Sequence, residues 1–410
     1  MAETGCKLAI VTMVFPAPTE TFASIEFSAL RDLGMDLKVY TMRPPLFCAG
    51  QLTRERALEE LPVSQGRWAQ QIYSIFLLAR HPVVATSLLS FLIAHGWRRP
   101  KQLAVGLMML PRSVQIYFEL CHDRVDVLHL YWGHFPSLVG YLVQRFSPDL
   151  AVSTSLSAYD LTMDFPCSWP VAKSSSFVRT WAAANVDAIS RNGVPRDQIR
   201  VCLQGIDLAA YPSKSTEKDN HQIVTCGRLI PEKGMHHVIH VFHELVGNYP
   251  DLRLRIIGDG PDRRRLESLA DELRLSDRVT FLGHIAHDRV LLELADAGVF
   301  IFLSEYVSDR VPNVVKEAMA SWCSCFVTPT KGIDELVEDQ TNGTIVSTES
   351  TSAIAAKIGS MLDNELKMSQ IQRAARGTVE RDFDSRQTVT TLIDAWTEAL
   401  PSNQSCRVSE

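Results

Sequence analysis

The sequence predicts an α/β protein with two domains, each built on a doubly wound parallel sheet. Its 410 residues exceed what one ordinary core accommodates. In both halves, short apolar runs of strand length alternate with helical patterns, which is typical of parallel sheets. A polar stretch at residues 204–220 separates the two series and is where we expect a linker. The predicted domains are residues 1–205 and 206–384, followed by a helix and tail at 385–410.

The first half alternates apolar strand-like runs with helical segments. A β-branched run at residues 8–15 closes at the turn signal PAP, and a helical stretch follows through Leu33. Further strand candidates are residues 36–42, 125–132 and 151–156. Alternation of this kind predicts a Rossmann-like sheet.

The second half alternates more regularly. Strand-like runs lie at residues 221–227, 252–260, 278–284, 298–304 and 323–328. Helices are predicted to begin near Met235, Asp262, Asp288 and Pro312, and the tail from Ser350 is predicted to be helical. This half therefore predicts a second doubly wound sheet.

The composition is that of an ordinary globular protein and excludes a disordered or fibrous chain. Hydrophobic residues make up 46% and charged residues 21%. Nine cysteines include no CxxC pair, and their odd number argues against a disulfide framework, so we expect a reducing compartment. The amino terminus has no basic leader with a cleavage site, and we expect a cytoplasmic protein without a nucleic-acid partner.

Residues 61–118 contain no acidic side chain although they hold six basic ones among many apolar residues. No run reaches the roughly 18–20 apolar residues that span a bilayer. Two interpretations stay open: helices packed under the first domain, or an interfacial face that touches an anionic membrane surface. The basic residues are Arg67, Arg80, Arg98, Arg99, Lys101 and Arg112.

A candidate anion site follows the first strand of the second half. This strand ends at Gly227, and the loop to the next helix carries Arg228 and Lys233. Glycine lets a ligand approach the backbone, and the helix amino terminus offers unpaired N–H groups to an anion. We expect the two cations to converge on two phosphates; the alternative is that they are solvated loop charges.

A second candidate cluster follows the strand at residues 298–304. Asp309 lies in the predicted loop and Glu317 in the second turn of the helix that Pro312 is positioned to start. Carboxylates at such a crevice can accept hydrogen bonds from the vicinal hydroxyls of a ribose or hexose. The alternative is that both are ordinary charges near a helix start.

Several motifs resemble retaining glycosyltransferases of the GT-B fold, the large glycogen-synthase-like family 4. The second-half motifs occur in the family's order and spacing: GRLIPEKG, IIGDGPDRRRLESLA, VTFLGH, VPNVVKEAMAS and IDELVEDQTNG. In the first half FPAPTETF, HLYWGHF and NGVPRDQIRVCLQGIDLAAY resemble the branch that makes exopolysaccharide and lipopolysaccharide. The resemblance implies two Rossmann-like domains facing a cleft, with the last helix packing back on the first domain.

The resemblance also implies roles for these residues. Arg228 and Lys233 would hold the donor diphosphate and neutralise the leaving group. Glu317 would bind the nucleotide ribose, and Asp309 would contact the transferred sugar. The backbone around Gly227, Asn313 and Val314 would complete the nucleotide site. It implies a nucleotide-diphosphate sugar as donor, a glycan or lipid-linked acceptor against the first domain, and neither metal nor cofactor.

The chain departs from the family pattern at three places. Asp309-Arg310 stands where Glu-Gly is usual, and Trp322 stands where glycine is customary. The histidine that members often place three residues before an aspartate is Ser157 here. Either His134, Tyr159 or Asp160 serves instead, or the step runs without this histidine.

Two alternatives to a glycosyltransferase remain. A catalytically silent GT-B protein, acting as a nucleotide-binding scaffold or partner subunit, would be consistent with the altered Asp309-Arg310 loop. A sugar-nucleotide epimerase would need convergent acid and base carboxylates, for which Asp309 and Glu317 are a thin basis.

Overall fold

The computed structural model describes residues 6–66, 68–212, 219–347 and 350–400. The chain divides into two compact units. The first unit comprises Met1–Gly205 together with Ser385–Glu410, and the second comprises Ile206–Asp384. Each unit is described by itself below.

The first unit contains a seven-stranded parallel sheet with the order β3-β2-β1-β4-β5-β6-β7. The order reverses between β1 and β4, and at such a point the carboxyl ends of the strands open a crevice for a ligand. The strands are β1 (Lys7–Thr12), β2 (Asp36–Thr41), β3 (Val63–Ser64), β4 (Val127–Leu130), β5 (Ala151–Ser155), β6 (Phe177–Thr180) and β7 (Ile199–Val201).

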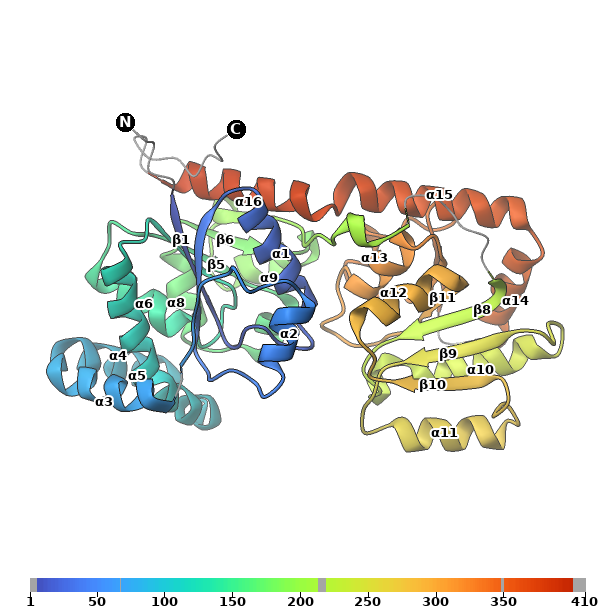
Figure 1. The fold of residues 1–410 in the computed structure, drawn as a ribbon, viewed down its shortest axis with the longest axis horizontal. Coiled ribbons are helices and arrows are strands. Elements are labelled where there is room, and N and C mark those ends of the chain that lie inside the picture. The colour runs from blue at the N-terminus through green and yellow to red at the C-terminus, as the bar shows by residue number, and fades with distance from the viewer. Residues whose placement is uncertain (1–5, 67, 213–218, 348–349, 401–410) are drawn as a thin grey trace. The chain divides into compact units, whose positions relative to one another are not determined.

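Two apolar clusters fill the faces of this sheet. One includes side chains of α1 and α16, and the other includes side chains of α4, α5 and α6. Figure 1 shows α3, α4 and α5 grouped together in the first unit. The helices are α1 (Thr21–Asp32), α2 (Ala49–Glu55), α3 (Trp68–Arg80), α4 (Pro82–Gly96), α5 (Pro100–Asp123), α6 (Ser137–Phe146), α7 (Ala158–Met163), α8 (Ser168–Lys173), α9 (Val186–Arg191) and α16 (Ser385–Ala399).

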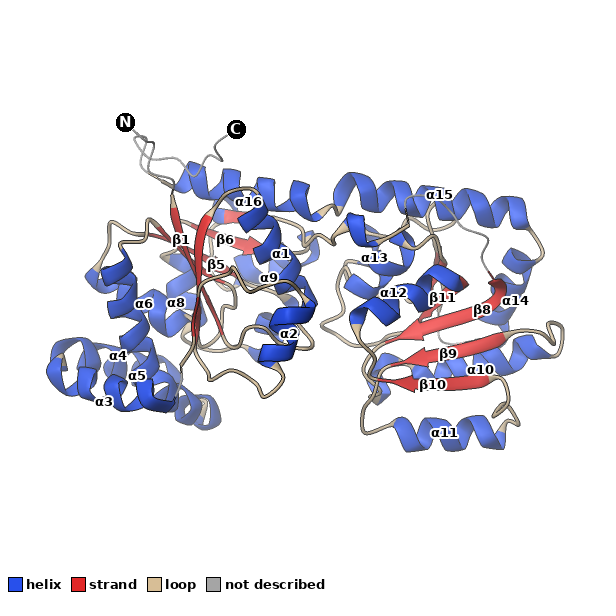
Figure 2. Ribbon diagram, in the orientation of Figure 1, coloured by secondary structure: helices blue, strands red, loops and turns tan. Residues whose placement is uncertain are grey.

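The second unit contains a six-stranded parallel sheet with the order β10-β9-β8-β11-β12-β13, which reverses between β8 and β11. Helices cover both faces of the sheet (Figure 2). The strands are β8 (Asp219–Cys226), β9 (Arg253–Ile257), β10 (Val279–Gly283), β11 (Ala297–Phe302), β12 (Ser324–Val327) and β13 (Thr344–Ile345). The helices are α10 (Met235–Val246), α11 (Arg263–Glu272), α12 (His287–Asp296), α13 (Asn313–Ala320), α14 (Thr351–Leu362) and α15 (Glu365–Asp382).

The predicted α/β class is confirmed, and the differences lie at the ends of elements. β1 ends at Thr12 instead of Phe15, because its pairing with the neighbouring strands ends there, at Thr41 of β2 and Leu130 of β4. β8 begins at Asp219, inside the predicted linker. The rest of that linker, residues 213–218, and the predicted surface residue Arg67 lie outside the described residues. Strands β3, β6, β7 and β13, which have four residues or fewer, were not predicted.

Helix α16 completes the core of the first unit. The Trp396 side chain is fully buried, and its Nε1 donates a hydrogen bond to Ser153 Oγ on β5 at 2.9 Å. Val389 and Leu392 pack in the same cluster as residues of α1. Seven cysteines in the described ranges form no disulfide, whereas Cys6 is disulfide-bonded.

A buried ion pair fixes α1 on the sheet. Arg179 on β6 donates to both carboxylate oxygens of Glu26 on α1, at 2.6 and 2.7 Å, and both side chains are buried. Burial alone lowers the pKa of Arg179, but the charge and hydrogen bonds of Glu26 offset this and raise it above its ordinary value.

We expect Glu26→Ala to destabilise the first unit by about 3–5 kcal/mol, because it leaves the Arg179 guanidinium buried without its counter-ion. Urea unfolding followed by circular dichroism measures this loss. Asp187→Ala removes one partner of the exposed pair with Arg196 and should change stability little. Equal losses in the two variants would contradict a special role for the buried pair.

Candidate functional site

The site in the second unit is built on the loop between β8 and α10. The loop runs from Gly227 through a 3-10 turn at Pro231–Lys233 to Gly234. Gly234 has φ +66°, and a Cβ there would lie 1.9 Å from the carbonyl oxygen of Leu303, which follows β11. Only glycine allows this approach, so the loop lies directly against the end of β11.

Lys233 lies at the end of this loop and contacts Asp309. Its Nζ is 2.7 and 2.6 Å from the two carboxylate oxygens of Asp309, and each side chain is 14% exposed. Ser304 Oγ also donates to Asp309. A lysine ammonium has three N–H donors, so one stays available beside this pair. The structure thus brings together two residues that the sequence predicts in separate motifs.

Arg228 is the exposed cation of the loop. Its side chain makes no hydrogen bond or ion pair with any residue that the structure describes, whereas the amide of Gly227 donates to Ile257. A guanidinium in this condition keeps all its donors for an anion. Arg228 and Lys233 therefore differ: one cation is free, and the other is already compensated by a carboxylate.

Glu317 lies in the second turn of α13, as predicted, and is buried. Its Oε1 is 3.0 Å from Nε2 of His287, the first residue of α12. Asn313 and Val314 form the first turn of α13, and Pro312 is the residue before it. His287 is missing from the predicted site, since no spacing pattern links it to a residue 30 positions later.

The thiol of Cys226, the last residue of β8, is influenced by the charges of both Lys233 and Glu317. Its pKa is raised to about 12, chiefly by burial and also by the charge of Glu317, while the charge of Lys233 opposes the rise. A thiol with this pKa stays protonated at neutral pH and is no nucleophile.

Val311, which follows the altered Asp309-Arg310 pair, and Trp322 adopt backbone conformations that favour glycine. Val311 has φ +40° and Trp322 has φ +63°. A positive φ is strained for a bulky or β-branched side chain and is frequent at functional loops. Trp322 Nε1 donates to the carbonyl of Pro212, at 3.1 Å, which holds this ring in place.

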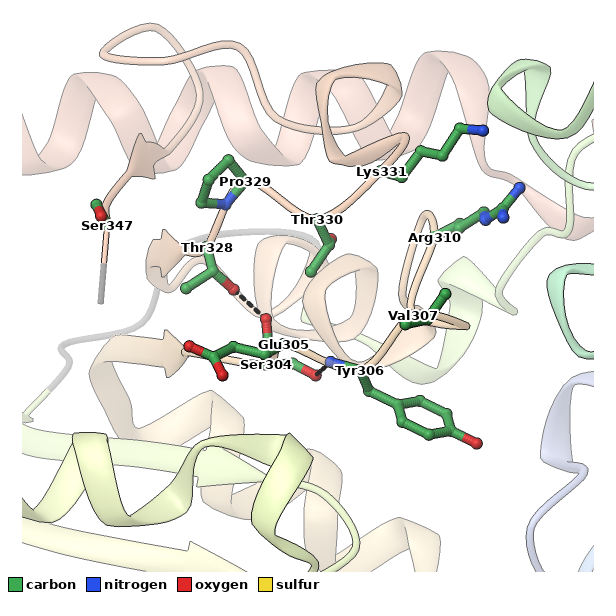
Figure 3. A pocket seen from close by; sticks show the side chains of 10 residues that line it. All are labelled: Ser304, Glu305, Tyr306, Val307, Arg310, Thr328, Pro329, Thr330, Lys331 and Ser347. Carbon is green, nitrogen blue, oxygen red and sulfur yellow. Dashed lines mark hydrogen bonds between the residues drawn. The ribbon is translucent and has the colours of Figure 1, made fainter. Parts of the chain in front are cut away.

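A pocket of about 350 Å³ lies beside the Lys233–Asp309 pair. Its walls come from the loops after β11 and β12 and from Ser347, and Figure 3 shows the cations Arg310 and Lys331 on two of these loops. Burial lowers the pKa of Arg310, and the charge of Glu335 opposes this. The lining residues are Ser304, Glu305, Tyr306, Val307, Arg310, Thr328, Pro329, Thr330, Lys331 and Ser347.

A third pair lies in the first unit, at the carboxyl ends of β4 and β5. His134 Nδ1 is 2.8 Å from Asp160 Oδ1, and both residues are buried. Asp160 also accepts hydrogen bonds from the Gly133 amide and from the amide and hydroxyl of Ser157. With an ionised Asp160, Nδ1 carries the proton and Nε2 of His134 is left as the acceptor. Ser157 caps α7.

Tyr159, the third candidate to replace the missing histidine, is exposed, unlike His134 and Asp160. Its side chain is 48% exposed, and its ring lies 5.7 Å from the His134 ring. Within the described ranges no three His, Cys, Asp or Glu side chains form a candidate metal site.

We expect Asp309→Asn to bind UDP several-fold more tightly than the unaltered protein, because the Asp309 carboxylate competes with an anion for Lys233 and repels it. Isothermal titration calorimetry with UDP measures this. Glu305→Gln, which removes an exposed carboxylate from the same loop, is the matched control and should have little effect. Weaker UDP binding by Asp309→Asn would mean that the carboxylate positions Lys233 for the anion.

Comparisons with known proteins agree with this geometry. Residues 209–378 match the family described as glycosyl transferases group 1. The putative colanic acid biosynthesis glycosyltransferase WcaL of Escherichia coli is 30% identical over 206 residues, which cover 48% of this chain and 50% of WcaL. The lipopolysaccharide core biosynthesis glycosyltransferase LpsE of Rhizobium meliloti is 26% identical over 324 residues, covering 75% of this chain and 88% of LpsE.

Solved structures show the same fold over nearly the whole chain. Anabaena Alr3699/HepE in complex with UDP-glucose has a TM-score of 0.71 at 16% identity, covering 96% of this chain and 99% of that one. Sucrose-phosphate synthase from Thermosynechococcus elongatus has a TM-score of 0.68 at 15% identity, covering 96% and 98%. The chain spans about half the length of the first curated relatives that it matches. Residues 209–378 are thus similar to glycosyl transferases group 1, and the chain has the GT-B fold of these solved structures.

Proposed function

We propose that this protein is a retaining, metal-independent glycosyltransferase that moves a sugar from a nucleotide-diphosphate sugar to a glycan or lipid-linked acceptor. The product belongs to a cell-surface polysaccharide or related glycoconjugate. The relatives WcaL and LpsE, named for colanic acid and lipopolysaccharide core biosynthesis, support this product class. The observation that carries the proposal is the placement of Arg228, Lys233 and Glu317 at the strand reversal of the second sheet.

The donor nucleotide binds at the carboxyl ends of β8 and β11. Arg228 supplies free guanidinium donors to the diphosphate, and Lys233 adds its remaining donor when the anion arrives. Both stabilise the charge that develops on the leaving diphosphate, and this electrostatic effect is the main contribution of the protein to the reaction. Glu317, held by His287, accepts hydrogen bonds from the ribose hydroxyls.

The His134–Asp160 pair acts on the transferred sugar. Asp160 orients the imidazole, so His134 presents Nε2 to a sugar hydroxyl at the carboxyl end of β4. This arrangement supplies the histidine that the chain lacks at Ser157. Asp309, whose carboxylate keeps acceptor capacity while it is bonded to Lys233, contacts the transferred sugar.

We expect UDP-, GDP-, ADP- or dTDP-sugars to raise the melting temperature selectively, because a ligand that binds only the folded state stabilises it. Arg228→Ala and Lys233→Ala should each lower transfer about 100-fold or more while the fold is retained. A thermal-shift screen identifies the donor, and product analysis on glycan acceptors measures transfer. Arg373→Ala, an exposed cation on α15, is the control.

Two outcomes would contradict the proposal. Full activity of both Arg228→Ala and Lys233→Ala would show that these residues do not bind the donor diphosphate. Nucleotide binding without turnover on any donor or acceptor would favour the silent scaffold, for which the compensated Lys233–Asp309 pair is the supporting observation.

The first unit, which binds the acceptor, contacts a membrane surface. The protein is cytoplasmic and is peripherally bound to the inner face of that membrane. α3, α4 and α5 bury one side in the core of the first unit and expose apolar side chains on another. The exposed cations Arg80, Arg98, Arg99 and Lys101 accompany them, and Arg98 lies 4.9 Å from the Trp97 ring. Apolar side chains beside basic ones suit an anionic lipid surface. The apolar residues are Tyr73, Ile75, Phe76, Val83, Leu89, Ile93, Trp97, Leu107 and Met108.

These helices are not predicted to span the bilayer individually. Within the described ranges no one helix is long and apolar enough to cross a membrane. Two helical segments, Tyr73–Arg80 and Pro82–Gly96, are together long and apolar enough to cross a membrane, but they meet at an angle of 99°. A surface contact needs no span.

We expect the protein to float with phosphatidylcholine vesicles that contain phosphatidylglycerol at low salt, and not with phosphatidylcholine alone. Reversing three charges, in the variant R98E/R99E/K101E, should weaken this binding at least tenfold, since each basic residue contributes about 1 kcal/mol near an anionic surface. The matched control R253E/R264E/R373E reverses three exposed cations of the second unit. No flotation at low salt, or equal loss in both variants, would count against the membrane surface.

A further inference from the structure

Trp132 is the centre of an aromatic cluster at the carboxyl edge of the first sheet. It directly follows Tyr131, the first residue after β4, and its ring lies 5.4 Å from Trp181 and 6.0 Å from Tyr159. Phe22, in the first turn of α1, lies 6.2 Å from Trp132 and 5.8 Å from Trp181. The aromatic cluster therefore joins segments that follow β1, β4, β5 and β6.

The cluster contains buried polar atoms that bond to nothing in the described part of the protein. The indole Nε1 atoms of Trp132 and Trp181 have no hydrogen-bond partner, and neither has the hydroxyl of Thr12 at the same edge of the sheet. Thr12 is the last residue of β1 and is 1% exposed, and Trp132 is 8% exposed. An unpaired buried donor costs about 1–3 kcal/mol, so several of them at one edge indicate a ligand that supplies partners.

Glu20 adds a carboxyl group to the same place. It is the residue before α1, and its side chain makes no capping hydrogen bond. Its Oε2 is buried and has no partner in the described ranges. Burial raises the pKa of Glu20 to about 7, and the nearby Trp132 indole and Arg56 lower it. The indole is close without meeting hydrogen-bond geometry, so both groups remain available.

The chemistry of the cluster selects among ligands. An anion is disfavoured, because Glu20 is the free ionisable group and the Arg56 guanidinium is already bonded to Ala17, Pro18 and Ser24. A hydrocarbon chain is disfavoured, because it would leave both indole N–H groups unpaired. A neutral pyranose meets both conditions: its hydroxyls accept from N–H donors and bond to a carboxyl, and its C–H face lies flat on aromatic rings.

We propose that Glu20, Trp132, Tyr159 and Trp181 form a subsite for a neutral pyranose ring of the acceptor glycan. Trp132 and Trp181 donate to sugar hydroxyls, Glu20 bonds to a further hydroxyl, and the exposed Tyr159 ring stacks on the sugar. The identification of the sugar as acceptor rests on the proposed glycosyltransferase function. The presence of the sugar site itself does not depend on it.

The test is saturation-transfer NMR on the full chain with the methyl glycosides of glucose, galactose and mannose. We expect at least one glycoside to bind, with saturation of its ring C–H protons. Trp181→Phe, which keeps the ring but loses the N–H donor, and Glu20→Ala should each weaken this binding about tenfold. Tyr159→Ala, at an exposed position, should also weaken it and serves if a buried variant fails to fold.

Trp97→Phe on α4 and Glu59→Gln, both at exposed positions, are the matched controls and should leave sugar binding unchanged. Thermal shifts by UDP and GDP are recorded on the same samples, because they report on the second unit. Sugar binding that is equal in Trp181→Phe, Glu20→Ala, Tyr159→Ala and the unaltered protein would overturn the proposal.

The two proposals fail in different ways. If no glycoside binds while a nucleotide stabilises the protein, the sugar subsite is wrong and the donor assignment stands. If a glycoside binds at these residues but no nucleotide binds and no transfer occurs, the subsite stands and the glycosyltransferase proposal fails.

Discussion

The proposed donor site depends on two contacts between backbone segments that only glycine permits. Gly234 lies against the carbonyl of Leu303, and Gly258, with φ +131°, lies so close to Gly227 that a Cβ would be 1.9 Å from its carbonyl oxygen. These contacts hold the loop between β8 and α10 against the ends of both neighbouring strands. The position of Lys233 relative to Asp309 follows from this constraint, and a side chain at either glycine would displace the cation.

The charged residues at the two strand reversals occur in pairs whose members come from different segments. Lys233 is paired with Asp309, Glu317 with His287, and His134 with Asp160. Pairing keeps charges acceptable in partly buried positions and fixes their orientation before a ligand arrives. Arg228 is the exception, since it is exposed and has no partner among the described residues. Its donors can therefore bind an anion without first breaking a bond to another described residue.

The sequence predicted those helices and strands that depend on residues close together in the chain. The helices that begin near Met235 and Asn313 and the strand β11 follow from periodicity and from the glycine and proline positions. Short strands such as β6 have too few residues to show an alternation. The partner of Glu317 and the unpaired indoles of Trp132 and Trp181 could not be predicted, because they arise from contacts between distant segments. The same holds for the positive φ of Val311, which neighbouring residues impose.

The return of α16 to the first unit makes the second unit an insertion within the first. The chain leaves the first unit after Gly205 and re-enters it at Ser385, and the amide of Ile206 donates to the carbonyl of Phe383 at 2.9 Å. Entry and exit of the inserted segment are therefore adjacent. A chain that stops at residue 384 lacks Trp396 and leaves the first core open, whereas a chain of residues 206–384 is continuous. Ribosomal synthesis consequently finishes the inserted unit before it supplies the last helix of the unit that was begun first.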